Sequence, residues 1–164
     1  MVSMALVRKA TPDDWESLRD TRLAALQDAP DAFGSTYAQQ AAYTEQDWLR
    51  RIAGDSTFLA FLDDDVSKPV GLAGGYRDDD GSYHLVSMWV SPAARGHGVG
   101  DALVNAVIAW ALTQPAPTAL HLWVTEANGS ARRLYERCGF VPTGERQPLP
   151  SNPELDEIAM SRPL

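Results

Sequence analysis

The segment from Trp89 to Gly100, WVSPAARGHGVG, constrains the fold more than any other part of the sequence. An apolar strand end leads into a turn with three alternate glycines, Gly96, Gly98 and Gly100, and residues with helical spacing follow. Glycine lets backbone amides approach a phosphate closely, and the helix that follows directs its positive end at the same place. This strand, turn and helix therefore predict a cradle for a phosphorylated ligand.

Composition limits the size of the fold and the classes of partner. With 164 residues, of which 45% are hydrophobic, the chain is long enough for one well-buried core, and we expect a single domain over residues 1–164. Fourteen Lys and Arg against 22 Asp and Glu give a net charge of -8, which disfavours nucleic acid and anionic membranes as partners.

The sequence also has no pattern typical of secretion, membrane insertion or metal binding. The N-terminus lacks a secretory signal and no apolar run is long enough to span a membrane. The single cysteine, Cys138, excludes an intrachain disulfide and a Cys-Cys metal site. These features predict a soluble cytoplasmic protein without a metal.

Turn residues and hydrophobic periodicity predict an α/β fold with about seven strands and four helices. Helices are expected from Thr11 to about residue 27, from Thr44 to about residue 54, after Gly100 and at about 129–138, with the segment 28–44 irregular. Strands are expected at 4–9, 57–63, 69–77, 82–90, 118–125, 140–145 and 154–162. Asp-rich turns indicate an antiparallel meander for strands two to four, whereas the helix between strands four and five predicts that these two are parallel neighbours.

Two common phosphate-binding motifs fit the glycine turn poorly. A Walker loop would continue with Gly-Lys-Ser/Thr, but Gly100 is followed by Asp101 and Ala102. A dinucleotide fingerprint would need a small residue at position 101 and would open a βαβ unit instead of ending a meander. Arg95-x-x-Gly98-x-Gly100 between a strand and a helix instead resembles the acyl-CoA loop of the GNAT N-acetyltransferase superfamily.

A second motif carries the same resemblance. Residues 128–140, NGSARRLYERCGF, open a helix with Asn128, place Tyr135 seven residues later and close with Gly139 and Phe140. This is similar to the second signature of that family, and the expected order of strands and helices matches the family along nearly the whole chain. The resemblance implies a GNAT fold with a mixed, mostly antiparallel sheet in which the parallel strands four and five splay apart.

The resemblance also implies an activity and a co-substrate. Members of the family transfer acetyl from acetyl-CoA to a primary amine by direct attack, without a metal, and a homodimer is their commonest assembly. The sequence leaves open whether the amine belongs to a small molecule, a peptide or a protein N-terminus. The alternative is a non-catalytic acyl-CoA sensor or regulatory module that keeps only the cofactor cradle.

Positions for acetyl-CoA follow from the same resemblance. The backbone of a bulged strand at Met88, Trp89 and Val90 would pair with the pantetheine arm, and Asn128 would hydrogen-bond the cofactor from across the splay. Arg95 would shape the turn, and backbone amides of the turn would hold the pyrophosphate, namely those of Gly96, His97, Gly98, Val99, Gly100 and Asp101. Because a carboxylate repels a pyrophosphate, we expect the Asp101 side chain to point to solvent.

Tyr135 is the candidate general acid. Attack by an amine expels a thiolate of pKa ~8.5, which a phenol of pKa ~10 can protonate only slightly uphill. The alternative is a packing role on the buried face of the helix, in step with Ala131, Leu134 and Cys138.

The general base is less defined. Some relatives carry a glutamate on the fifth strand, five residues before the motif asparagine, but Trp123 occupies that position. Glu126 is the candidate retained for the base, with His84, Ser87 and His121 as alternatives. Each also has an ordinary structural explanation, such as a helix-entry acid for Glu126 or a strand residue for either histidine.

Acceptor recognition is expected in the segment between the first two helices and in the C-terminal strands. Phe33 and Tyr37 are the candidate acceptor-binding residues. Trp48 is a further candidate for an apolar wall, and acids in the same segment for attraction of a cationic amine, namely Asp28, Asp31 and Glu45. Core packing and a solvated loop explain the same residues equally well. Glu157 either faces the site or lies on an exposed strand edge, and Trp89 and Trp123 either wall the thioester or pack.

Overall fold

One seven-stranded sheet organises the chain. The computed structural model describes residues 4–164. The strands are β1 (Ala5–Lys9), β2 (Thr57–Leu62), β3 (Gly71–Arg77), β4 (Tyr83–Val90), β5 (Ala119–Thr125), β6 (Val141–Leu149) and β7 (Asn152–Pro163). Their order across the sheet is β1-β2-β3-β4-β5-β7-β6, and all neighbours are antiparallel except the parallel pair β4 and β5. The predicted α/β class and the mixed, mostly antiparallel sheet are confirmed.

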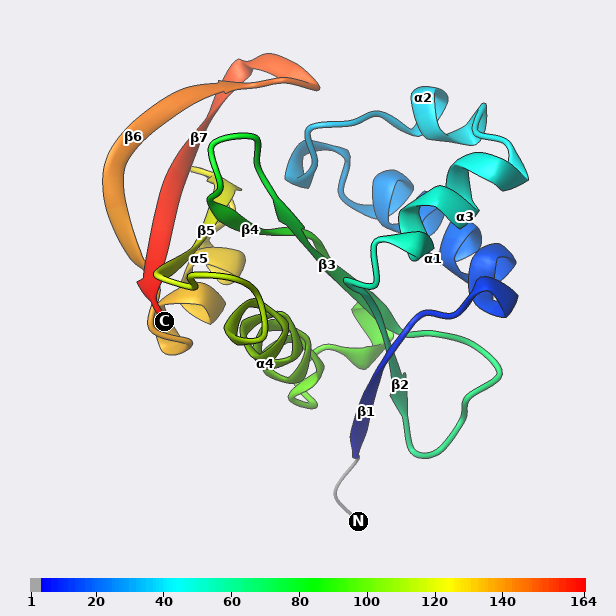
Figure 1. Ribbon diagram of the computed structural model, residues 1–164. Helices are drawn as coiled ribbons and strands as arrows, with labels where there is room; N and C mark the ends of the chain where they lie inside the picture. Colours follow the sequence, from blue (N-terminus) through cyan, green and yellow to red (C-terminus); the bar gives the residue numbers. More distant parts are fainter. Residues whose placement is uncertain (1–3) are drawn as a thin grey trace.

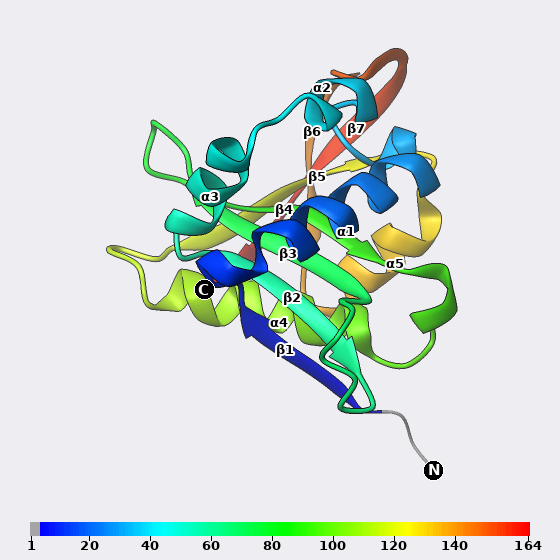
Figure 2. The same ribbon diagram turned by 90° about the vertical axis from the view of Figure 1, so that its right-hand side faces the viewer.

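Helices cover both faces of this sheet. One face carries α1 (Trp15–Asp28), α2 (Tyr37–Ala41) and α3 (Glu45–Ala53), and the opposite face carries α4 (Val99–Leu112) and α5 (Gly129–Arg137) (Figures 1 and 2). Within residues 4–164, no helix is both long enough and apolar enough to cross a membrane.

The alternation of side chains along β2 shows why both faces are covered. Phe58 and Ala60 pack into the cluster beneath α4, whereas Leu59 and Phe61 pack into the cluster beneath α1 and α3. Because successive strand residues point to opposite faces, a strand that is apolar throughout needs a layer on each side. The sheet is therefore the middle layer of three, and the sites described below open at its centre.

Two segments differ from the sequence-based expectation. The segment 28–44 contains the short helix α2, so the described part of the chain has five α-helices instead of the four expected. Thr36 and Gln39 form a capping box at its start, in which the backbone N–H of Gln39 donates to Thr36 Oγ1 at 3.2 Å. The sixth strand runs past residue 145 to Leu149 although it contains Pro142 and Pro148. Proline is tolerated there because β6 is an edge strand that needs hydrogen bonds on one side only.

A partly buried ion pair stabilises the connection between β1 and α1. A 3₁₀ turn, Pro12–Asp14, leads directly into α1. Arg8 in β1 donates two hydrogen bonds to the Asp14 carboxylate, Nη1 to Oδ2 at 2.8 Å and Nη2 to Oδ1 at 3.0 Å. Asp14 also accepts the backbone N–H of Thr11 at 2.7 Å. These bonds fix the angle at which the first helix leaves the sheet.

Candidate active site

The centre of the sheet is open because β4 and β5 pair only at their beginnings. Tyr83 lies opposite Leu120 and His84 opposite His121, and no further pair joins the two strands within residues 4–164. On its other edge, β4 carries a bulge in which Ser87 and Met88 together oppose the single residue between Leu72 and Gly74 of β3. Ser87 adopts φ +61°, a left-handed conformation that redirects the strand. The predicted bulge and splay are both present.

A cavity of about 910 Å³ fills the splay. It is lined by the ends of β4 and β5, the glycine turn, the start of α5 and the 3₁₀ turn Pro30–Ala32. The residues predicted for the cofactor that line it are Met88, Trp89, Val90, Arg95, Gly96, Gly98, Val99, Gly100, Asp101 and Asn128. The predicted acid Tyr135 also lines it, whereas His97 is exposed and does not. Ten of the eleven predicted cofactor residues therefore converge on one space, which we call the cofactor cavity.

Each glycine of the turn has its own structural reason. Gly96 and Gly98 have φ of +82° and +77°, which residues with a Cβ rarely adopt. Gly100 lies inside α4, and a methyl group there would come within 3.0 Å of Leu134 Cδ2. The first two glycines therefore shape the turn, and the third lets α4 approach α5.

The turn presents unpaired backbone amides to the cofactor cavity. Ala102 N–H bonds to the Gly98 carbonyl at 3.1 Å, so the amides just before it precede the first hydrogen bond of α4. Arg95 holds the turn in place, since its Nε donates to the Val90 carbonyl at 3.1 Å and its Nη2 to Asp28 at 2.8 Å. Asp28 also accepts Trp89 Nε1–H at 3.0 Å. This carboxylate therefore braces the cradle and is already neutralised by Arg95.

Asp101 is paired instead of pointing free into solvent. Its carboxylate lies 3.3 Å from Arg137 Nη2, and its side chain is 43% exposed. The negative charge expected to repel a phosphate is thus partly compensated from α5. Asn128 accepts the Ala131 amide through Oδ1 at 3.3 Å as the cap of α5, which leaves its side-chain NH₂ as the group available to a ligand.

Tyr135 is buried, with 7% of its surface exposed, and its ring meets Phe140 edge-on at 5.9 Å between centroids. It belongs to the core cluster and also lines the cofactor cavity, so the packing and catalytic explanations are compatible. Burial raises the pKa of its phenol above the usual value, with a further contribution from Cys138. Tyr135 is therefore protonated at neutral pH.

A second cavity of about 550 Å³ lies on the α1–α3 side of the sheet. We call it the acceptor cavity. It shares Ala32 and Trp123 with the cofactor cavity, so the two spaces meet at these residues. Side chains with polar or charged groups in its wall include Arg22, Arg51, Tyr76, His84, Ser87 and Glu157. Phe33 lines it as predicted, and Trp123 stands between the two spaces.

Glu157 is the carboxylate of the acceptor cavity. It is 7% exposed, and desolvation raises its pKa, although the hydrogen bond from Gln147 Nε2 at 2.6 Å opposes part of the rise. In the sheet it lies opposite Thr125 of β5, two positions along the same face from Trp123. The neighbouring strand β7 thus supplies a carboxylate close to position 123, where the family resemblance implies a glutamate in some relatives.

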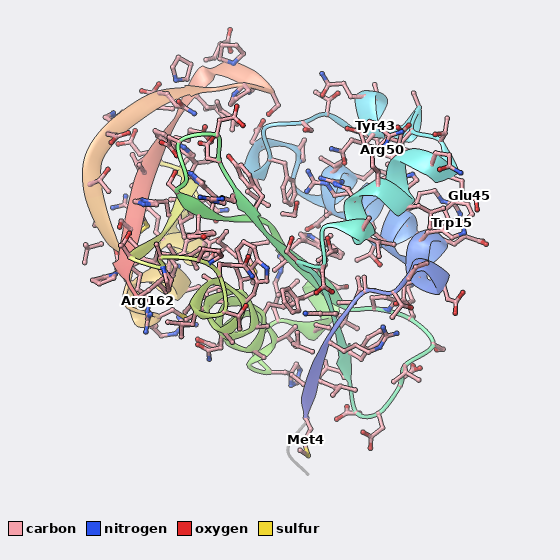
Figure 3. The ribbon with its side chains drawn as sticks, viewed as in Figure 1. Met4, Trp15, Tyr43, Glu45, Arg50 and Arg162 are labelled. Carbon is pink, nitrogen blue, oxygen red and sulfur yellow. The ribbon has the colours of Figure 1, made fainter. Side chains whose placement is uncertain are left out.

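Other predicted residues lie outside the acceptor cavity. Glu126 is exposed and bonds to Arg146, with Arg146 Nη1 at 2.9 Å from its Oε1, so the structure does not bring it to the site. Tyr37 is 41% exposed, and Trp48 is fully buried in the core beneath α1 and α3. Glu45 lies on the outer side of α3 (Figure 3). Asp31 faces the cofactor cavity, not the acceptor cavity.

The two histidines considered as bases are placed differently. His84 lines the acceptor cavity, and burial together with the charge of His121 lowers its pKa. Its ring stacks on Tyr76 at 5.0 Å, and its Nε2 lies 3.1 Å from Ser82 Oγ. His121 lies beside it on β5 but does not line either cavity.

Arg22 and Arg51 are functional candidates that the sequence reasoning missed. A signal was available for Arg22, because it is four residues after Leu18 and four before Leu26 on the buried stripe of α1. A cation in step with buried leucines is unusual enough to indicate a role. Within residues 4–164, no cluster of three or more His, Cys, Asp or Glu side chains is arranged to hold a metal ion.

Comparison with known proteins gives consistent matches. The Acetyltransferase (GNAT) family profile matches residues 17–140. Mycothiol acetyltransferase of Mycobacterium avium (strain 104) is 34% identical over 140 residues, covering 79% of this chain and 43% of that protein. The chain thus spans less than half the length of this relative.

Solved structures share the fold over nearly the whole chain. An acetyltransferase of the GNAT family from Streptococcus pneumoniae superposes with a TM-score of 0.80 at 24% identity, covering 98% of this chain and 99% of that one. The structure of yncA from Salmonella typhimurium with its cofactor acetyl-CoA gives 0.77 at 19% identity, covering 98% and 94%.

Proposed function

The chain belongs to the acetyltransferase (GNAT) family, and from this premise we propose that it transfers the acetyl group of acetyl-CoA to the primary amine of an acceptor. The observation that carries the proposal is the meeting of two cavities at Ala32 and Trp123. One cavity contains the candidate acid Tyr135 and the other contains the buried carboxylate Glu157. Two neighbouring spaces that share these walls suit a reaction between two bound substrates in one direct step.

The cofactor cavity fits the chemistry of coenzyme A. An unpaired strand edge is costly unless a ligand satisfies its backbone groups, and the β4 residues Met88 to Val90 offer such an edge to an amide-containing arm. The amides from Gly96 to Asp101, with the positive end of α4 behind them, suit a pyrophosphate. Bound there, acetyl-CoA would supply an activated thioester. The presence of acetyl-CoA in the structure of yncA supports the same assignment.

Tyr135 is proposed as the general acid that protonates the leaving sulfur. Its raised pKa keeps the hydroxyl protonated until a thiolate develops beside it. A thiolate desolvated in the same cavity is also more basic than in water, which reduces the mismatch between donor and acceptor.

Glu157 is proposed as the general base that accepts a proton from the acceptor amine. Desolvation raises the pKa of Glu157, so its carboxylate is a stronger base than that of an exposed glutamate. Desolvation of an ammonium group in the same cavity lowers the pKa of the amine, which favours proton transfer to Glu157. Glu126 is not suited to this role, because it lies outside both cavities and forms an ion pair with Arg146.

The proposal is tested by release of free CoA from acetyl-CoA and by Tyr135→Phe. Purified protein is offered pooled amines, peptides and polyamines, and release that depends on an acceptor is expected. With that acceptor, Tyr135→Phe should keep the Kd for acetyl-CoA and lower kcat by about 10²-fold or more, because the substitution removes only the proton donor.

Tyr43→Phe is the matched control, since Tyr43 is an exposed tyrosine that does not line either cavity. Unchanged turnover in Tyr135→Phe would remove the proposed acid. Tight binding of acetyl-CoA without turnover for any acceptor would instead favour a non-catalytic acyl-CoA sensor.

A further inference from the structure

The wall of the acceptor cavity has two arginines, and neither has an acidic partner among residues 4–164. Arg22 of α1 is 4% exposed, and Arg51 of α3 is partly buried. Among the described residues, neither guanidinium forms an ion pair with a carboxylate. The fold therefore holds two positive charges at one end of this cavity.

Gln40 of α2 holds the two arginines together without neutralising them. Its Oε1 accepts Arg22 Nε at 2.8 Å and Arg51 Nη1 at 3.3 Å. Arg22 also lies over the ring of Phe33, 4.5 Å from its centroid. Its Nη1 is buried and has no hydrogen-bond partner in the described part of the chain. The guanidinium is thus oriented by neutral contacts, and a donor remains unsatisfied.

This arrangement is costly for the folded protein without a ligand. Removing a guanidinium from water and placing a second one nearby both disfavour the charged state, and the pKa of Arg22 falls to about 9. Desolvation also lowers the pKa of Arg51. A buried cation is normally paired, and an arginine fork matches the two oxygens of a carboxylate or phosphate. An anionic group bound in the cavity would satisfy the free Nη1 and neutralise the pair.

We propose that the acceptor is a small amine that carries an oxyanion, a carboxylate or a phosphate, which Arg22 and Arg51 bind. This inference rests on the proposed acetyltransferase function and specifies the class of its second substrate. Glu157 lines the same cavity, so the wall contains both a site for the amine and a site for the anion. The cavity volume of about 550 Å³ suits a small molecule.

Four amines of similar length separate the alternatives. β-Alanine carries a carboxylate, O-phosphoethanolamine a phosphate, propylamine no charge beyond its amine, and 1,3-diaminopropane a second cation. A panel of L-amino acids, each compared with its amide and its decarboxylated amine, extends the same contrast to larger side chains. With acetyl-CoA fixed, we expect kcat/KM to be at least about 10-fold higher for the oxyanion class, as one charge-assisted hydrogen bond provides.

Arg51→Gln should raise KM for the preferred acceptor roughly 10- to 100-fold with little change in kcat, because anion binding is the same in the ground and transition states. Arg50→Gln is the matched control, since Arg50 is the adjacent arginine of α3, with a side chain 74% exposed and paired with Asp47 (Figure 3). It should leave both constants near the wild-type values. Thermal unfolding of each variant establishes that it folds.

Preference for propylamine or 1,3-diaminopropane, or equal KM values in Arg51→Gln and Arg50→Gln, would overturn the inference while leaving the acetyltransferase proposal intact. If no amine is acetylated, thermal shift titrations with β-alanine and O-phosphoethanolamine decide the matter without turnover. A stabilisation present in the wild type and absent in Arg51→Gln would support an oxyanion site, and the enzyme proposal alone would fail. No stabilisation by either compound would overturn the inference.

Discussion

At the scale of single residues, the site combines side chains whose environments change their chemistry. Trp123 occupies the strand position where some relatives carry a glutamate, and Glu157 on the neighbouring β7 supplies a carboxylate in the acceptor cavity. Burial raises the pKa of Glu157 and of Tyr135, so one is a stronger base and the other a firmly protonated donor. Asp101, expected to repel a phosphate, is held by Arg137 instead.

Glu157→Gln should lower kcat and raise stability at neutral pH. The folded-state pKa of Glu157 lies above its unfolded value, so ionisation destabilises the fold as pH rises through that folded pKa. The amide removes this cost, and Tm should rise by about 1 to 4 °C at pH 7 and by less at pH 4. In the wild type, kcat/KM should fall as pH decreases through a pKa above the usual glutamate value.

Glu126→Gln is the comparison for this prediction, because Glu126 is an exposed glutamate that bonds to Arg146 outside both cavities. Turnover and thermal unfolding are measured for both variants. Loss of turnover in Glu126→Gln, with Glu157→Gln unaffected, would assign the base to Glu126.

At the scale of elements, hydrogen bonds at strand and helix ends position the site. The Ser87 bulge bends β4 away from β5, and the Gly96 and Gly98 turn redirects the chain into α4. On the other face, α1 carries Arg22 into the acceptor cavity, and its departure from β1 depends on Arg8 and Asp14. Local geometry at these ends therefore decides which side chains reach the cavities.

Asp14→Asn should destabilise the protein by about 1 to 2 kcal/mol at pH 7. The Arg8 guanidinium lowers the pKa of Asp14 from 3.8 to about 2, with help from the Thr11 amide. A lowered folded pKa stabilises the fold above pH 3.8, and this contribution disappears as pH falls toward 2. Urea unfolding of wild type and variant at pH 7 and near pH 2 should show the difference and its loss.

Asp20→Asn provides the control for the ion pair. Asp20 pairs with Arg19 at 2.9 Å, but its side chain is 68% exposed, so its removal should change stability by less than about 0.5 kcal/mol. An Asp14→Asn effect equally small would show that the bond between β1 and α1 contributes little.

At the scale of the whole molecule, the function proposed depends on a sheet that is left open at its centre. The sheet stays continuous because β4 and β5 pair at their beginnings, with β3 and β7 holding the outer edges of the splay. Figures 1 and 2 show α1 to α3 on one face of the sheet and α4 and α5 on the other. The acceptor cavity lies on the α1–α3 side, and the cofactor cavity is lined from both sides of the sheet, by the end of α1 and by the starts of α4 and α5.

Coenzyme A should slow hydrogen exchange of backbone amides in Met88–Val90 and in the turn Gly96–Asp101, because these groups lack partners on the cavity side. Amides of β2 should be unaffected, since β2 is paired on both edges. Exchange measured by mass spectrometry with and without coenzyme A checks this. Protection confined to other segments would place the cofactor elsewhere.

Local patterns along the chain predict much of the fold and much of the cofactor cavity. Hydrophobic alternation and turn residues located all seven strands, and the helix between β4 and β5 indicated their parallel pairing. The Gly96 to Gly100 turn and the Asn128 to Phe140 motif predict residues that line the cofactor cavity, because an anion cradle is made of consecutive backbone amides. The capping box of Thr36 and Gln39, which begins α2, is also a local pattern.

The acceptor side required three-dimensional proximity. Arg22, Arg51 and Glu157 come from α1, α3 and β7, and their shared cavity depends on long-range packing that no local spacing encodes. The ion pairs of charged side chains also could not be predicted from the sequence. Glu126 pairs with Arg146 outside the site, and Asp28 pairs with Arg95. The chemistry of a charged or buried side chain depends on neighbours that are distant in the sequence, and only the tertiary structure brings these together. A backbone motif is formed by consecutive residues, so the sequence alone determines its neighbours.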